Sequence, residues 1–138
     1  MTKLNDTKYF KVKEIIYSKT AEKNNIDNYP KDEEVICNLN YTLQRLNEIR
    51  EGFGSPIYIN SGYRCEELNK LVGGVKNSKH QEGLAVDLRF DAELFKYILD
   101  NYSFDQLIRE GNKRSGMWIH LGFKKDIYKE RNQVIYCQ

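Results

Sequence analysis

The stretch of sequence from Ser78 to Phe90 reads SKHQEGLAVDLRF, and it joins a histidine to a clear alternating pattern. The apolar face of this pattern carries Val86, Leu88 and Phe90, and the opposite face carries Ala85, Asp87 and Arg89. Such alternation is typical of a strand with one face on a core and the other on a cleft. We therefore predict a strand over residues 85–90, with Asp87 pointing into the cleft.

A second alternating stretch, MWIHLGF at residues 117–123, carries the other histidine of the chain, His120. Its apolar face holds Ile119, Leu121 and Phe123, and its opposite face holds Trp118, His120 and Gly122. His80 is expected at the edge of the first strand. If the two strands pair, one surface brings together His80, Asp87 and His120.

These three residues suit a catalytic zinc site. Two imidazoles and one carboxylate are a common donor set for zinc, and catalytic sites leave a fourth position for water or substrate. A zinc ion would lower the pKa of that water and polarise a carbonyl group. Gly83 lets the chain turn between the ligands. The alternative from spacing alone is that both histidines are ordinary core or surface residues and that Asp87 is an exposed carboxylate.

Along the rest of the sequence, the apolar patterns predict mainly helices in the N-terminal half and mainly strands in the C-terminal half. Asp32 resembles an N-cap, and apolar residues at steps of three and four then predict a helix that ends near Gly52 and Gly54. The other predicted elements are a helix within residues 10–21, a loop over 22–31, strands over 56–60 and 104–110, a helix over 64–72, a helix after Asp91 and a turn over 111–116. Leu68 and Leu71 are expected to face inward. The order is typical of an α+β fold with a small, mostly antiparallel sheet and helices packed on one side.

The composition is that of an ordinary globular protein. The 138 residues are 40% hydrophobic and 30% charged, and we expect one domain over residues 1–138. A net charge of +2 without a basic run among aromatics argues against nucleic-acid binding. The chain shows no apolar run long enough for membrane insertion and no signal peptide. Three cysteines without a CxxC pair favour a reducing compartment over a disulfide framework.

Several segments together resemble one known family. Residues 78–87 match the signature SxHxxGxAxD of the zinc D-Ala-D-Ala carboxypeptidase family, and residues 118–120 match its WIH segment. Upstream, SGYR at residues 61–64, LN at 68–69 and VGGV at 72–75 are similar to the carboxypeptidase-like branch of that family. The family also includes phage endolysin peptidases. The resemblance covers most of the chain and implies the hedgehog/DD-peptidase fold.

The resemblance also implies roles for individual residues. His80, Asp87 and His120 are similar to the family's ligands for one zinc ion. Arg64 matches the arginine that in the family binds substrate and stabilises the oxyanion, and a guanidinium group suits both tasks. The alternative for Arg64 is a surface residue that packs its apolar stem.

The general base is the point where the sequence departs from the family. Many members place Glu, Asp or His a few residues before the last zinc-binding histidine, but residues 113–119 contain no acid and no histidine. Met117 stands where several relatives have a carboxylate. We expect Glu110, at the end of the strand before the turn, to act as the base. The alternative is a solvated acid at the end of a strand.

Three further residues are candidate substrate contacts, each with a plainer alternative. Gln106 shares the strand face of Glu110 and either hydrogen-bonds substrate or a ligand, or is an ordinary polar residue of the strand. Ser78 either hydrogen-bonds near the metal site or caps a turn. Trp118 either flanks the cleft or packs against the strand beside it.

The resemblance implies zinc-dependent hydrolysis of peptide bonds in peptidoglycan stem peptides, most closely of the D-Ala-D-Ala carboxypeptidase type. One alternative is a lytic L-alanyl-D-glutamate endopeptidase of a phage or prophage. Another is a metal-stabilised, non-catalytic module that binds the cell wall, which the missing acid near His120 favours. We expect a monomer that waits in the cytoplasm until release and then acts on the cell wall.

Overall fold

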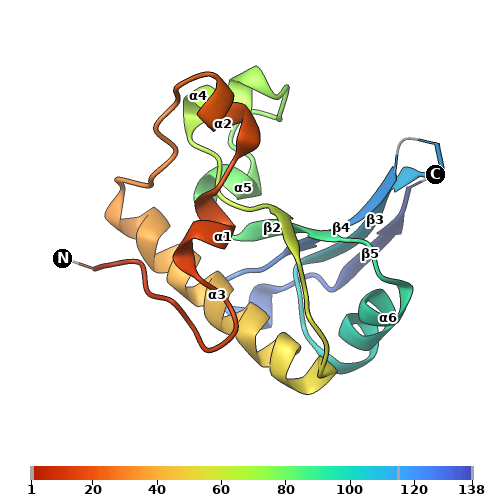
Figure 1. Ribbon diagram of the computed structural model, residues 1–138. Coiled ribbons are helices and arrows are strands. Elements are labelled where there is room, and N and C mark those ends of the chain that lie inside the picture. Colours follow the sequence, from red (N-terminus) through yellow and green to blue (C-terminus); the bar gives the residue numbers. More distant parts are fainter. Residues whose placement is uncertain (1, 115, 138) are drawn as a thin grey trace.

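The computed structural model describes residues 2–114 and 116–137 (Figure 1). The helices are α1 (Val12–Ile16), α2 (Lys19–Lys23), α3 (Glu33–Phe53), α4 (Glu66–Leu71), α5 (Lys79–Glu82), α6 (Ala92–Asn101) and the 3₁₀ helix η1 (Ile127–Lys129). The strands are β1 (Ile59–Ser61), β2 (Ala85–Arg89), β3 (Gln106–Asn112), β4 (Gly116–Gly122) and β5 (Gln133–Tyr136). Within the described residues, no helix combines the length and apolar character that crossing a membrane requires.

The five strands form one sheet in the order β1-β2-β4-β3-β5. The pairs β1/β2, β2/β4 and β3/β4 are antiparallel, and only β5 runs parallel to its neighbour β3. The predicted α+β class with a mostly antiparallel sheet is therefore confirmed. Where β2 meets β4, Asp87 lies directly opposite His120, and Leu88 lies opposite Ile119.

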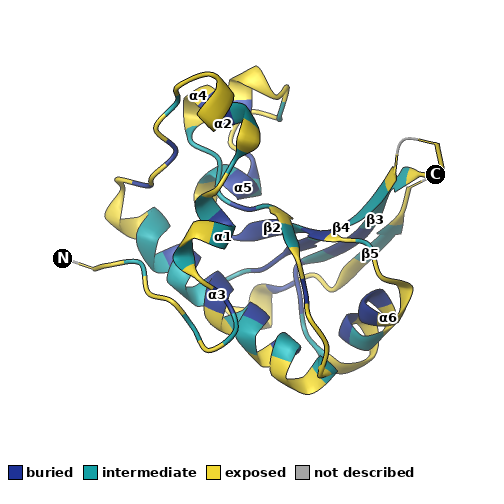
Figure 2. Ribbon diagram, viewed as in Figure 1, coloured by how far each residue is buried: buried dark blue, intermediate teal, exposed yellow. Residues whose placement is uncertain are grey.

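The core lies between one face of this sheet and the helices α3 and α6. Figure 2 shows buried residues along β2 and β4 and on α6. The sheet contributes Val86, Leu88, Leu107, Ile119 and Leu121, α3 contributes Leu39, Leu43, Leu46 and Ile49, and α6 contributes Leu94, Phe95 and Ile98. Each such side chain stabilises the fold by roughly 1.5–3 kcal/mol when fully buried. Because side chains alternate along a strand, Asp87 and His120 point to the opposite face.

The ends of the two longer helices follow the predicted caps. The Asp32 carboxylate accepts hydrogen bonds from the backbone N–H groups of Glu34 and Val35, at 2.8 and 3.3 Å, and α3 begins there. Gly54, with φ of 78°, ends the same helix. Asp91 caps α6 in the same way as Asp32 caps α3. Each of these caps is worth about 1 kcal/mol.

The N-terminal region differs from the prediction of one helix within residues 10–21. The chain forms two short helices, α1 and α2, separated at Tyr17 and Ser18. Ser18 accepts a hydrogen bond from the backbone N–H of Ala21 at 3.1 Å and so begins a second helix. The apolar spacing was compatible with one helix, but a serine at an N-cap position favoured a new start.

The strand boundaries also differ from the predictions. The strand expected over residues 56–60 is β1 at Ile59–Ser61, since Pro56 has no backbone N–H to pair. The strand expected over 104–110 is β3, which continues to Asn112 because its ladder with β4 continues to Gly116. Of the turn expected over 111–116, residues 111, 112 and 116 belong to the strands, and residues 113 and 114 form a turn. Residue 115 lies outside the described part of the chain.

The structure corrects the sequence prediction at two residues, Leu71 and His80, and adds one strand, β5. Leu71 was expected to face inward but is 52% exposed, because α4 lies at the edge of the molecule, beyond the main core (Figure 1). His80 was expected at the edge of a strand but lies on the short helix α5. Strand β5 was not predicted, since only four residues pair there with β3.

Candidate metal centre

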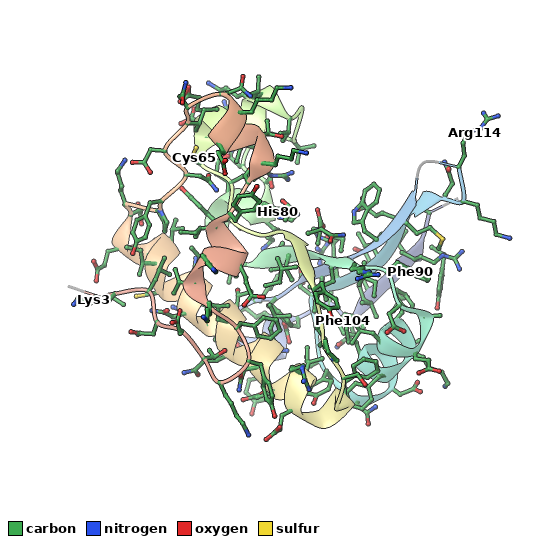
Figure 3. All side chains as sticks on the ribbon, in the orientation of Figure 1. Lys3, Cys65, His80, Phe90, Phe104 and Arg114 are labelled. Carbon is green, nitrogen blue, oxygen red and sulfur yellow. The ribbon has the colours of Figure 1, made fainter. Side chains whose placement is uncertain are left out.

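His80 is held in one orientation by two hydrogen bonds. Its backbone N–H donates to the hydroxyl of Ser78, the N-cap of α5, at 3.0 Å. Its ring Nδ1 lies 2.9 Å from the carbonyl oxygen of Gly62. A carbonyl can only accept, so Nδ1 carries the hydrogen and Nε2 presents its lone pair. The side chain is buried between the α4–α5 end of the molecule and the sheet (Figure 3).

Asp87 and His120 face His80 from the sheet. One carboxylate oxygen of Asp87, Oδ1, lies 3.3 Å from Nε2 of His80 and 3.1 Å from Nδ1 of His120. The two imidazole rings lie edge to face, with centroids 5.3 Å apart. One ligand atom from each of the three residues therefore lies within 4.8 Å of the other two.

This donor set fits a zinc ion. Two imidazole nitrogens and one carboxylate oxygen are the protein ligands of many catalytic zinc sites. Histidines that bind metal usually donate their second N–H to a carbonyl or carboxylate, as His80 does to Gly62. The three residues reach the site from α5 and from the paired strands β2 and β4.

The charge state of Asp87 suits metal binding. Burial raises the pKa of its carboxyl group, but the interactions with the neighbouring rings of His120 and His80 lower it by more. The net effect holds the pKa of Asp87 well below its ordinary value. The carboxylate is therefore ionised at neutral pH and available as a ligand.

An open pocket of about 370 Å³ surrounds this group. It is lined by all eight site residues that the sequence indicated: Arg64, Ser78, His80, Asp87, Gln106, Glu110, Trp118 and His120. Lys79 and the loop of residues 72–75 complete its wall. The sequence had not indicated Lys79. A larger cavity of about 840 Å³ lies near Cys65 and Leu71, but it contains no histidine, so we place the chemistry in the smaller pocket.

Glu110 and Arg64 bring opposite charges to the pocket. Glu110 pairs with Trp118 across β3 and β4, two residues from the pair formed by Ile108 and His120. Glu110 and His120 are thus diagonal neighbours on one face, a separation that long side chains span. Burial lowers the pKa of the Arg64 guanidinium, whereas the charges of Asp87 and Glu110 raise it. Arginine stays protonated in proteins, so Arg64 remains a cation.

The polar groups of Gln106 and Ser78 already have partners. The side-chain amide of Gln106 donates to Gln133 on β5 at 2.7 Å. The Ser78 hydroxyl caps α5, as one of its two predicted roles required. Their roles as substrate contacts stay predictions, as does that of Trp118. The Gly62 carbonyl, which orients His80, was not predicted, because a backbone group leaves no side-chain signal in a sequence.

Comparisons with known proteins agree on one family. The chain matches the sequence model of the family described as peptidase M15 over residues 8–122. It is also 32% identical over 74 residues to the zinc D-Ala-D-Ala carboxypeptidase of Streptomyces albus G. That alignment covers 51% of this chain and 29% of the relative, so it spans less than a third of the relative's length.

Proposed function

Because this chain belongs to the peptidase M15 family, we propose that it is a zinc metallopeptidase that hydrolyses peptide bonds in peptidoglycan stem peptides. The observation that carries the proposal is the convergence of His80, Asp87 and His120 in one pocket. The same pocket holds a cation, Arg64, and an acid, Glu110, which are the two further groups that amide hydrolysis needs.

The chain's own residues divide the reaction between them. A zinc ion held by His80, Asp87 and His120 would act as a Lewis acid toward water and the scissile carbonyl. Glu110 accepts a proton as the water oxygen attacks the carbonyl carbon. It then returns the proton to the amine nitrogen as the carbon–nitrogen bond breaks. The products are a carboxylic acid and a free amine, and Glu110 is left as it began.

Arg64 supports the finer proposal that the enzyme is a D-Ala-D-Ala carboxypeptidase. Its Nε is buried and has no hydrogen-bond partner within the described residues. A guanidinium in this position can bind the terminal carboxylate of a peptide bidentately. Such a contact places the last peptide bond, rather than an internal one, at the metal. The relative from Streptomyces albus G carries that activity in its name.

The experiment that tests this proposal is mass spectrometry of defined stem peptides incubated with the protein, with added zinc or with a chelator. We expect zinc-dependent loss of one terminal alanine. Asp87→Asn should lose both zinc and turnover, whereas Asp100→Asn, a matched change at an exposed ion pair on α6, should lose neither.

Other outcomes would replace the proposal in defined ways. An internal cut would assign a lytic endopeptidase, the activity expected of a phage or prophage lysis protein. Stoichiometric zinc without any cleavage would assign a metal-stabilised module that binds the cell wall.

A further inference from the structure

Asn28 is a buried amide in the loop between α2 and α3, and it does not line the pocket. The residue is 7% exposed. Nδ2 donates to the carbonyl oxygens of Ile16 and Tyr63, each at 2.9 Å, and Oδ1 accepts from the backbone N–H of Cys65 at 2.8 Å. Both amide hydrogens and the amide oxygen are thus engaged. Two of the three bonds go to the residues on either side of Arg64.

This arrangement requires an amide. The carbonyl oxygens of Ile16 and Tyr63 can only accept, and the N–H of Cys65 can only donate. A flipped amide would lose all three bonds. A carboxylate of the same size would place an acceptor against two carbonyl oxygens and would lose two bonds. Asn28 is therefore chemically matched to the backbone that flanks Arg64.

Hydrogen bonds with α1 and α5 also hold the backbone around Arg64. The N–H of Tyr63 donates to the carbonyl of Ile15 at 2.8 Å, and the N–H of Arg64 donates to the carbonyl of His80 at 3.2 Å. The Gly62 carbonyl accepts from the His80 ring. Asn28 supplies the bonds at two further groups of this backbone, the carbonyl of Tyr63 and the N–H of Cys65.

The Arg64 side chain depends on that backbone for its position. Arg64 lines the pocket, and within the described residues the buried Nε of its guanidinium has no hydrogen-bond partner. Asp87 and Glu110 act on it through their charges. A small shift of the Arg64 backbone would therefore move the guanidinium relative to the metal ligands, because no bond at Nε opposes the movement.

We propose that Asn28 is a positioning residue for the reaction: by holding both neighbours of Arg64, it sets where the guanidinium stands in the pocket. The inference rests on the proposed function in one respect, that Arg64 contacts the substrate. Asn28 itself does not touch the reacting atoms.

A double-mutant cycle tests this inference. Asn28→Asp and Asn28→Ala are each measured alone and combined with Arg64→Ala, using a stem peptide that ends in D-Ala-D-Ala. In the otherwise unchanged protein, each Asn28 variant should lower kcat/KM on the order of 100-fold, the effect of misplacing a binding group by about 1 Å. In the Arg64→Ala protein, the same change should lower kcat/KM by about twofold or less, because the group it positions is gone.

The cycle includes a matched control and a check on folding. Asn25→Asp makes the same chemical change at an exposed position of the same loop and should leave kcat/KM unchanged. All rates are measured below the lowest melting temperature, at equal zinc content. Asn28→Ala adds no repulsion against the two carbonyls and so is the milder variant. An equal loss of kcat/KM in both backgrounds would overturn the inference, as would no loss in either.

A binding measurement separates this inference from the proposed function. Trp118 is the single tryptophan of the chain and lines the pocket, so its fluorescence reports on ligands there. Acetyl-D-Ala-D-Ala with a free carboxylate is titrated into metal-free protein. Asn28→Asp should weaken binding in the otherwise unchanged protein and not in Arg64→Ala. That pattern without any cleavage would overturn the proposed reaction but would still show that Asn28 positions Arg64 for ligand binding. No binding and no cleavage would overturn both.

Discussion

Asp87 is the residue on which the geometry of the pocket depends. One of its oxygens lies within 3.3 Å of a nitrogen of each histidine, so it links α5 to β4. The hydrogen bond from Nδ1 of His80 to Gly62 leaves only Nε2 free on that ring. The three groups therefore present the donor set of a catalytic zinc site without rearrangement of the backbone.

Glu110 is the residue whose role has the sharpest test. Replacing it with glutamine keeps its size but removes the proton acceptor that we propose, so kcat should fall at least about 100-fold. Zinc content should be unchanged, because Glu110 is not among the three converging ligands. Steady-state kinetics and metal analysis on the same sample measure both quantities.

Glu93→Gln, at an exposed position on α6, is the matched control for this change and should leave kcat unchanged. If Glu110→Gln retains both zinc and full turnover, Glu110 is not the base. Another group would then have to act as the base in place of the carboxylate that several relatives have at the position of Met117.

At the scale of elements, the loop of residues 72–75 forms one wall of the pocket and is anchored to α4 by one buried amide. Nδ2 of Asn69 donates to the carbonyl of Val75 at 2.8 Å, and the N–H of Gly74 donates to the carbonyl of Asn69 at 2.9 Å. A Cβ at Gly74 would lie 2.1 Å from Oδ1 of Asn69. Only glycine allows the loop to approach α4 this closely.

Gly74→Ala should therefore displace the wall of the pocket. We expect a loss of about 1–3 kcal/mol in the free energy of unfolding, as for other overpacked sites. We also expect KM to rise by more than kcat falls, because we propose that this wall contacts substrate, whereas none of its residues is among the three metal ligands. Urea unfolding and steady-state kinetics measure the two effects.

Gly54→Ala is the control for stability alone. Gly54 ends α3 with φ of 78°, and an added Cβ there would meet nothing within 4 Å. The substitution should cost about 1 kcal/mol through backbone strain and leave KM unchanged. An unchanged KM in Gly74→Ala as well would mean that the loop does not contact substrate.

At the scale of the whole molecule, Asp105 joins the C-terminal segment to the sheet. Its carboxylate is 1% exposed and accepts hydrogen bonds from Nε and Nη2 of Arg131, at 3.0 and 2.8 Å. Lys124 lies 3.7 Å away. Hydrogen bonds from the Arg131 side chain lower the pKa of Asp105 by more than burial raises it, so the pKa lies below its ordinary value of 3.8.

This shift predicts how stability depends on pH. Because the pKa is lower in the folded state, the stabilisation is complete above the unfolded value of about 4 and is lost as the pH falls through the folded value. Asp105→Asn should lower the free energy of unfolding by about 2 kcal/mol at pH 7. The difference in the free energy of unfolding between Asp105→Asn and the unchanged protein should shrink below about pH 4.

Urea unfolding at pH 7, 5 and 3 measures that difference. Asp27→Asn, which removes an exposed ion pair with Lys31, is the control and should have little effect at any of these pH values. A difference for Asp105→Asn that stays constant down to pH 3 would show that the carboxylate charge does not contribute to stability.

Much of the fold was predictable because its signals are local. The alternation around Asp87 and around His120 correctly predicted β2 and β4, and Asp32 and Asp91 correctly predicted the starts of α3 and α6. The missed elements lack such signals. α5 has four residues, and β5 forms only by pairing with β3, so neither shows a period of its own.

The sequence by itself determined the donor types, the strands that carry Asp87 and His120, and the family, because each of these is encoded in short local patterns or in several short motifs along the chain. Only the tertiary structure decided that the donors meet. Asp87 and His120 lie 33 positions apart and face each other through the register of β2 and β4. His80 reaches them from a helix, and Asn28 reaches the flanks of Arg64 from 35 and 37 positions away. Such contacts arise from the packing of whole elements, for which no short stretch of sequence carries a signal.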